Sequence, residues 1–267
     1  MVKNKMGNFQ HKHSLGQNFL KDKSVLTRII DSVDIKEDDL IIEIGPGQGA
    51  LTKYLKLFHA NLICFEIDTR VKKYLDNFLD DKTDIIYQDF LTIDLNKFLA
   101  DYKYNKLYVI ANLPYYITTP IIEKLSNSNL EFEAMVLMVQ NEVANRLSAI
   151  PGTKDYGAIT VLLKYLYDVQ KLFFVSRKSF DPMPKVDSAV IKLTPRNDGF
   201  VATNFDVFNK LVRDAFKMKR KNLKNNLSSY NLDIINEVLN KYGLSLSDRA
   251  EMVCLDCFIE IANVISK

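Results

Sequence analysis

Short apolar runs alternate with amphipathic stretches through the first 195 residues, and this alternation constrains the fold more than any other feature. Runs typical of strands lie at residues 40–44, 62–67, 84–88, 107–111, 132–139, 169–175 and 189–193. Stretches with helical spacing of apolar residues lie at 25–33, 50–58, 69–79, 119–125, 142–149 and 158–167. Strand–helix alternation of this kind predicts an α/β fold, with a parallel sheet covered by helices on both faces.

The pattern changes near residue 197, where Arg196, Asn197, Asp198 and Gly199 form a polar, turn-prone stretch. Only helical patterns follow it, at residues 205–218, 221–227, 232–242 and 255–265. We therefore predict two domains, an α/β domain over residues 1–196 and a small all-helical domain over 197–267.

Lysine and arginine are concentrated in three parts of the chain, although the net charge is only +3. One group lies in the first thirty residues and a second lies between residues 210 and 224, while the third comprises Arg177, Lys178 and Lys185. A charge run is often a solvated helix face. Groups this dense favour instead a polyanionic partner such as nucleic acid.

The composition is that of a soluble globular protein, with 47% hydrophobic and 26% charged residues. No apolar stretch reaches the roughly 18–20 residues of a membrane helix, and the basic N-terminus lacks the apolar region of a secretory signal. Three cysteines suit a reducing cytoplasm. Cys254 and Cys257 have zinc-like spacing but no second pair, so we expect core packing and no metal.

A four-residue loop, Asn112-Leu113-Pro114-Tyr115, follows the apolar run at 107–111 directly. Proline fixes its own φ and restricts the residue before it, so the loop should be rigid. It would present an amide oxygen, a backbone carbonyl and an aromatic face in fixed relation. A flat ring that carries an –NH2 group needs such a set, with two acceptors and one stacking surface. The motif therefore predicts chemistry on a nucleobase or amide nitrogen, although the same residues also occur in plain turns.

A glycine-rich loop, Gly45-Pro46-Gly47-Gln48-Gly49, follows the first predicted sheet strand and precedes a helix. Glycines allow a sharp turn and the close approach of a ligand. The spacing is G-x-G-x-G rather than the G-x-G-x-x-G of dinucleotide sites, and Pro46 removes an N–H that a pyrophosphate would use. Both features argue against NAD.

Two carboxylates, Glu66 and Asp89, come at the ends of the next two predicted strands. Glu66 can accept hydrogen bonds from both ribose hydroxyls of an adenosine, and Asp89 can accept one from an adenine amine. Because open α/β sheets bind ligands at the carboxyl edge, these acids and the glycine loop together predict a site for S-adenosylmethionine.

Taken together, these motifs resemble the small-subunit (16S) ribosomal RNA adenine dimethyltransferase family. The matching segments follow one another in order from about residue 11 to the C-terminus. They are residues 13–20, 45–52, 66–68, 88–89, 112–120, 140–147, 180–190, 215–223 and 249–251.

The resemblance implies a Rossmann-like S-adenosylmethionine-dependent methyltransferase domain with a basic N-terminal lid at 1–24, and a helical RNA-binding domain. It implies cofactor contacts by Asn18, Leu20, Gly45, Glu66, Asp89 and Asn112. It implies a target-adenine site formed by Asn112, Leu113 and Tyr115, with Phe180 as a second wall for the flipped base. Tyr116 is expected simply to pack. The RNA-binding residues that it implies are Arg146, Lys185, Lys217, Arg220 and Lys221.

The activity implied is dimethylation of two adjacent adenosines in a hairpin loop near the 3′ end of small-subunit rRNA, with a role in ribosome biogenesis. The partner would be the assembling 30S subunit, and we expect a cytoplasmic monomer. Three alternatives stay open at this point. They are a large-subunit (23S) rRNA methyltransferase that confers macrolide resistance, a non-catalytic RNA-binding assembly factor, and a protein or DNA amine methyltransferase.

Overall fold

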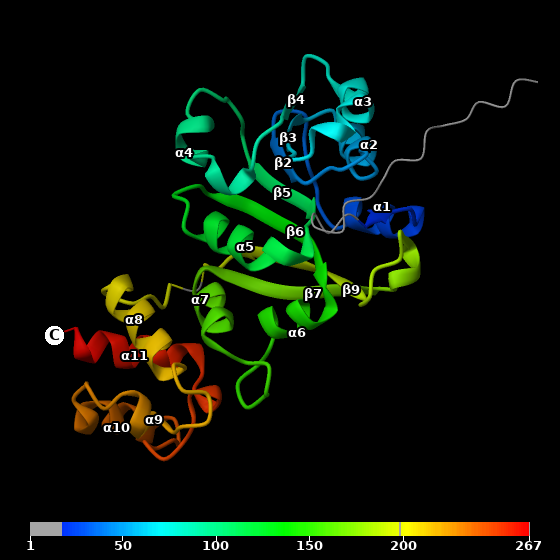
Figure 1. The fold of residues 1–267 in the computed structure, drawn as a ribbon. Helices are drawn as coiled ribbons and strands as arrows, with labels where there is room; N and C mark the ends of the chain where they lie inside the picture. The colour runs from blue at the N-terminus through cyan, green and yellow to red at the C-terminus, as the bar shows by residue number, and fades with distance from the viewer. Residues whose placement is uncertain (1–17, 198, 267) are drawn as a thin grey trace, which may run out of the picture. The chain divides into compact units, whose positions relative to one another are not determined.

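The computed structural model describes residues 18–197 and 199–266, and its central element is a seven-stranded sheet in the order β4-β3-β2-β5-β6-β9-β7 (Figure 1). The strands are β2 (Leu40–Ile44), β3 (Asn61–Phe65), β4 (Thr83–Ile86), β5 (Leu107–Asn112), β6 (Phe132–Gln140), β7 (Tyr167–Val175) and β9 (Ser188–Pro195). A separate two-stranded sheet pairs β1 (Phe19–Leu20) with β8 (Phe180–Asp181) in antiparallel orientation. Every strand predicted from the sequence is present, with ends that differ by a few residues.

Strand β2 lies between β3 and β5 and is parallel to both. All five of its residues are buried, and so are the first five residues of β5. A parallel sheet is covered by helices on both faces, and its inner strands therefore read as continuous apolar runs rather than as alternating ones. This burial explains why residues 40–44 and 107–111 were recognisable as strands.

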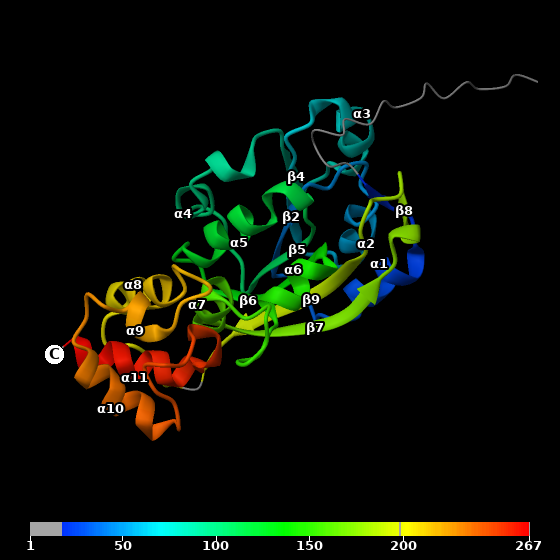
Figure 2. The ribbon, with the colours of Figure 1, turned by 60° about the horizontal axis from the view of Figure 1, so that its bottom comes forward.

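Helices cover both sides of these parallel strands. Figures 1 and 2 show α4 (Leu95–Phe98) and α5 (Thr118–Ser126) on one side of β2–β5, and α1 (Lys23–Ile30) and α2 (Thr52–Leu55) on the other. Helix α1 begins at an Asp22 cap, whose carboxylate accepts a hydrogen bond of 3.0 Å from the Ser24 N–H.

The predicted helices at 50–58 and 69–79 are each composite. Helix α2 continues into the 3₁₀ turn η2 (Lys56–Phe58), while α3 (Lys72–Leu75) lies between the turns η3 (Thr69–Val71) and η4 (Asp76–Phe78). Helix α4 was not predicted, because a helix of four residues is too short to establish a periodic pattern.

By its contacts the chain divides into two compact units. The first unit comprises the described residues up to Glu131 together with 136–140 and 174–188, and the second comprises 132–135, 141–173 and the residues from Ala189 onward. The proposed division into functional domains at residue 196 stays a prediction. No described helix is long and apolar enough to cross a membrane.

The second unit is rich in helices. They are α6 (Asn141–Leu147), α7 (Ala158–Leu166), α8 (Phe205–Ala215), α9 (Leu223–Asn226), α10 (Leu232–Lys241) and α11 (Leu255–Ile265). Among the described residues beyond Pro195 the structure has helices and turns only, as the sequence predicted.

Helices α7, α8, α9, α10 and α11 of the second unit share one apolar core. Phe208 of α8, Leu239 of α10 and Phe258 of α11 are all fully buried there. Cys257 is buried in the same core and Cys254 packs against it, as expected for this cysteine pair. The amphipathic spacing of α8, α10 and α11 thus produces the core by turning one face of each helix inward.

Replacing Phe258 with alanine should lower the free energy of unfolding by about 3–5 kcal/mol, because a fully buried ring would leave a cavity against Phe216. Urea unfolding followed by far-UV circular dichroism measures this change. Phe205→Ala is the matched control, since Phe205 is 39% exposed. Equal losses for the two variants would contradict the assignment of Phe258 to the core.

Candidate cofactor and target-base site

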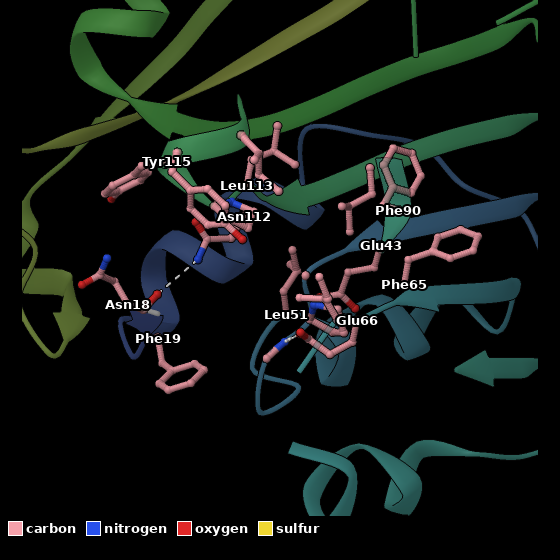
Figure 3. A pocket seen from close by; sticks show the side chains of 18 of the residues that line it. Asn18, Phe19, Glu43, Leu51, Phe65, Glu66, Phe90, Asn112, Leu113 and Tyr115 are labelled. Carbon is pink, nitrogen blue, oxygen red and sulfur yellow. Dashed lines mark hydrogen bonds between the residues drawn. The ribbon is translucent and has the colours of Figure 1, made fainter. Parts of the chain in front are cut away.

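The carboxyl ends of four neighbouring parallel strands meet at one pocket of about 240 Å³ in the first unit (Figure 3). Gly45 follows β2, Glu66 follows β3, Asp89 comes shortly after β4, and Asn112 ends β5. All four line the pocket, so the structure brings together the residues that the sequence placed on separate strands. Figure 3 shows Glu43 and Glu66 grouped beside Leu51, and Asn112 and Tyr115 grouped nearer Asn18.

The glycine loop depends on backbone angles that other residues rarely adopt. Gly45, Gly47 and Gly49 have φ values of +70°, +58° and +84°. A Cβ atom on Gly47 would lie 2.7 Å from the ring of Phe19, and one on Gly49 would lie 2.3 Å from the ring of Phe78. The glycines therefore leave room for two aromatic rings, one of which, Phe19, lines the pocket.

Glu66 holds this loop against the end of β3. Its Oε2 accepts a hydrogen bond of 3.0 Å from the Gly47 N–H, and its Oε1 accepts one of 2.8 Å from the Asp68 N–H. Burial raises the pKa of Glu66, and these backbone hydrogen bonds oppose the rise. Each carboxylate oxygen keeps a second lone pair, which suits the two hydroxyls of a ribose.

Asp89 and two aromatic rings form the next part of the pocket. The Oδ1 of Asp89 accepts a hydrogen bond of 2.9 Å from the Leu91 N–H, and its Oδ2 has no hydrogen-bond partner among the described residues. Phe65 and Phe90 meet edge to face with their centroids 5.4 Å apart. An acceptor beside apolar walls is the environment that an adenine ring with its amine requires.

Glu43 is a pocket residue that the sequence analysis did not single out. It is only 1% exposed, and it accepts hydrogen bonds from Thr52 Oγ1 at 2.7 Å and Cys64 Sγ at 3.5 Å. Loss of solvent raises the pKa of Glu43 to about 8. An acid inside the apolar run at 40–44 was the available signal, because a buried strand seldom contains a carboxylate.

Hydrogen bonds hold the loop after β5 at Leu113 and at Pro114. The Leu113 N–H donates to the Met138 carbonyl at 3.0 Å, and Thr118 Oγ1 donates to the Pro114 carbonyl at 3.1 Å. Asn112 Nδ2 donates to the Asn18 carbonyl at 3.5 Å, a long contact drawn in Figure 3. With Nδ2 turned toward Asn18, Oδ1 is the amide atom left to accept a hydrogen bond from a ligand.

The aromatic residues near this loop differ in exposure. Tyr115 lines the pocket, and its hydroxyl shares a hydrogen bond of 2.6 Å with Ser188, which is fully buried. Burial raises the pKa of Tyr115. The expectation that Tyr116 simply packs is wrong, because it is 52% exposed and lines the pocket. Phe180 is 2% exposed and does not line the pocket, so its role as a wall for the base stays a prediction.

Residues 18–22 of the predicted lid are fastened to the segment around β8. Leu20 of β1 pairs with Phe180 of β8, and Ser179 Oγ donates to Asp22 Oδ2 at 2.9 Å. Asn18 and Leu20 line the pocket, and their contacts to a cofactor stay a prediction. Residues 1–17 of the lid lie outside the described residues.

The predicted RNA-binding residues occur in both units. Arg146, Lys217, Arg220 and Lys221 are exposed in the second unit, and Arg146 and Lys221 line a second cavity there. Lys185 is exposed in the first unit.

The pocket fits S-adenosylmethionine in three respects. Gly45 and Gly47 put bare backbone into its lining at positive φ, Glu66 suits a ribose, and Asp89 with its apolar neighbours suits an adenine. A pocket of this kind at the carboxyl edge of an open α/β sheet defines an S-adenosylmethionine-dependent methyltransferase.

Comparison with known proteins agrees with this class. The sequence profile of the family described as "Ribosomal RNA adenine dimethylase" matches residues 8–267. The chain therefore belongs to the ribosomal RNA adenine dimethylase family.

Individual relatives match over nearly their whole length. Proteins named "Ribosomal RNA small subunit methyltransferase A" from Bacillus pumilus and Geobacillus thermodenitrificans are 40% and 42% identical to this chain, and the matches cover 97% and 96% of it and 92% of each relative. The crystal structure of a dimethyladenosine transferase from Plasmodium falciparum has a TM-score of 0.75 at 29% identity, covering 91% of this chain and 95% of that one. The 23S rRNA methyltransferase ErmE has the same fold, with a TM-score of 0.73 at 23% identity, over 94% of this chain and 100% of that one.

Glu43 should make stability fall with rising pH. Its pKa is near 4.5 when unfolded and about 8 when folded, so between these values the folded chain holds one proton more. The free energy of unfolding then decreases by up to about 1.4 kcal/mol per pH unit from this group alone. Glu43→Gln should remove that slope, as measured by urea unfolding at pH 5.5, 6.5 and 7.5 without cofactor.

The exposed Glu131→Gln variant is the control for this measurement, and its pH dependence should run parallel to that of the wild type. If Glu43→Gln is also parallel to the wild type, Glu43 does not hold a proton in the folded state.

Proposed function

We propose that this chain transfers methyl groups from S-adenosylmethionine to the N6 amines of two adjacent adenosines near the 3′ end of small-subunit (16S) rRNA. The product would be N6,N6-dimethyladenosine in a hairpin loop, formed during small-subunit biogenesis. One observation carries the proposal, namely the rigid loop that sets the Asn112 amide and the Leu113 carbonyl beside the cofactor pocket. The small-subunit methyltransferases that match this chain over nearly its full length support the choice of rRNA.

The cofactor-binding residues in this proposal are Asn18, Leu20, Gly45, Glu66, Asp89 and Asn112. S-adenosylmethionine, when bound, supplies an electrophilic methyl group on its sulfonium sulfur. Glu66 accepts from the ribose, Asp89 accepts from the adenine amine, and Phe19 closes over the glycine loop. The pocket thus holds the donor by its nucleoside and leaves the side nearer Asn112 for the acceptor.

The target amine is a poor nucleophile because its lone pair is delocalised into the adenine ring. Asn112 Oδ1 and the Leu113 carbonyl would accept its two hydrogens and favour a tetrahedral nitrogen with its lone pair free to attack. Tyr115 and Phe180 would stack on the base, and Ser188 fixes the Tyr115 hydroxyl. Because no histidine or cysteine lines the described pocket, we attribute most of the acceleration to positioning, with no dedicated general base.

The target base must leave its stack, which costs a few kcal/mol. A single-stranded loop reduces that cost, and contacts to phosphates help to offset it. We assign those contacts to Arg146, Lys185, Lys217, Arg220 and Lys221, which are all exposed. In this proposal residues 1–196 form the catalytic domain with its lid at 1–24, and residues 197–267 form the RNA-binding domain. The enzyme would act as a cytoplasmic monomer on the assembling 30S subunit.

The substrate assignment predicts methyl transfer to small subunits only. Purified enzyme, labelled S-adenosylmethionine and undermethylated 30S subunits should yield dimethyladenosine, while large-subunit RNA precursor in parallel stays unlabelled. Label in the large-subunit RNA would assign the chain to 23S methylation. No label in either RNA would point to a non-catalytic assembly role and contradict the proposal.

Asn112→Ala should reduce methyl transfer at least about a hundredfold, because it removes an acceptor aimed at the reacting amine. Thermal melting should change little, since the Asn112 side chain makes only one long hydrogen bond within the described part of the chain. Asn96→Ala, at an exposed position of α4, is the control and should keep full activity. Retained transfer by the Asn112 variant would overturn the proposed mechanism.

A further inference from the structure

A second cavity of about 410 Å³ lies entirely within the second unit. Five cations line it, namely Arg146, Lys154, Lys219, Lys221 and Arg249. All five are exposed, and the first four form no ion pair or side-chain hydrogen bond with another described residue. Four unpaired cations around one cavity indicate an anionic ligand.

The segments that carry these cations are held in place by hydrogen bonds. Asn226 fastens the lysine-bearing loop after α8, because its Nδ2 donates to the Ala215 carbonyl at 2.7 Å and its Oδ1 accepts from the Met218 N–H at 3.1 Å. Thr160 Oγ1 donates to the Arg146 carbonyl at 2.8 Å and ties α6 to the start of α7. The cavity is therefore part of a fixed framework rather than a gap between loose loops.

The cavity also contains groups that a simple anion would not need. Glu142 and Asp155 line it, and neither has a side-chain partner among the described residues. A third acid, Glu251, lies 4.0 Å from Arg249. Phe216 and Met218 add apolar surface. Carboxylates repel a bare phosphate but accept hydrogen bonds from base amines, so the set suits a nucleotide, with its phosphate and its base in different surroundings.

We propose that this cavity binds one unstacked nucleotide of the RNA substrate, with its phosphate against the cations and a base that carries an exocyclic amine against Glu142 and Asp155. The inference rests on the proposed function in taking RNA as the substrate. RNA is read chiefly at unpaired nucleotides whose edges are free to hydrogen-bond. The second unit would thereby select a feature of the RNA separate from the methylated adenosines.

The two carboxylates allow a sharp test. If they bind a base amine, their removal weakens oligocytidylate binding, whereas a simple loss of negative charge would strengthen it. Fluorescence anisotropy would measure binding of labelled 12-residue oligocytidylate and oligouridylate, since cytosine has the amine and uracil lacks it. We expect the wild type to prefer oligocytidylate by about fivefold or more. Glu142→Gln combined with Asp155→Asn should abolish this preference by weakening oligocytidylate binding.

Asp233→Asn combined with Glu237→Gln is the matched control, because it removes two exposed acids from α10, outside the cavity. Through its lower negative charge alone, this control should bind both oligonucleotides slightly more tightly and keep the preference. If the Glu142/Asp155 variant behaves like the control, or if the wild type shows no preference, the proposal is wrong. Thermal melting would verify that both double variants fold.

Competition with free cytidine monophosphate shows whether the cavity binds a nucleotide within RNA or a free nucleotide. Millimolar cytidine monophosphate should leave oligocytidylate bound, whereas displacement at micromolar concentration would assign the cavity to a free nucleotide and overturn the RNA assignment. The methyl-transfer assay on 30S subunits fails or succeeds independently of this binding assay. A preference for oligocytidylate without methyl transfer would therefore contradict the proposed function and leave the cavity assignment standing.

Discussion

Strand β2 pairs with β3 on one side and β5 on the other, and the register of these two ladders sets the positions of the pocket residues. Ile42 lies opposite both Ile63 and Val109, so the three strands end close to one level. Gly45 and Glu66 directly follow the ends of β2 and β3, and Asn112 is the last residue of β5. A shift of one residue in either ladder would move a functional group off the carboxyl edge and turn its neighbours to the opposite face of the sheet.

Much of this arrangement could be predicted from the sequence, because buried parallel strands are continuous apolar runs and their ends carry distinctive residues. Helix α11 was predicted with its observed bounds, since it has strong helical spacing over eleven residues. The pairing of β1 with β8 could not be predicted. Each strand has two residues, and the contacts beside the pair join Asp22 to Ser179 across 157 positions, so no local pattern marks them.

Single side chains of the site were harder to foresee than its backbone. Motifs indicated which residues line the pocket, yet they did not reveal that Glu43 is buried with a raised pKa or that Tyr116 is exposed. Such properties depend on how distant segments cover a residue, and the sequence around it does not contain that information. The second cavity could not be predicted for the same reason, because three separate stretches of the second unit supply its lining.

The pairing of β1 with β8 also has a consequence for the order of events during protein synthesis. The glycine loop and strands β2–β5 come early in the chain, but Phe19 and Leu20 gain their strand partner only when Phe180 and Asp181 have been made. A nascent chain would thus possess the floor of the pocket long before its cover is fastened. Cofactor capture then becomes a late event, completed when most of the polypeptide already exists, and a prematurely terminated product would bind the methyl donor loosely.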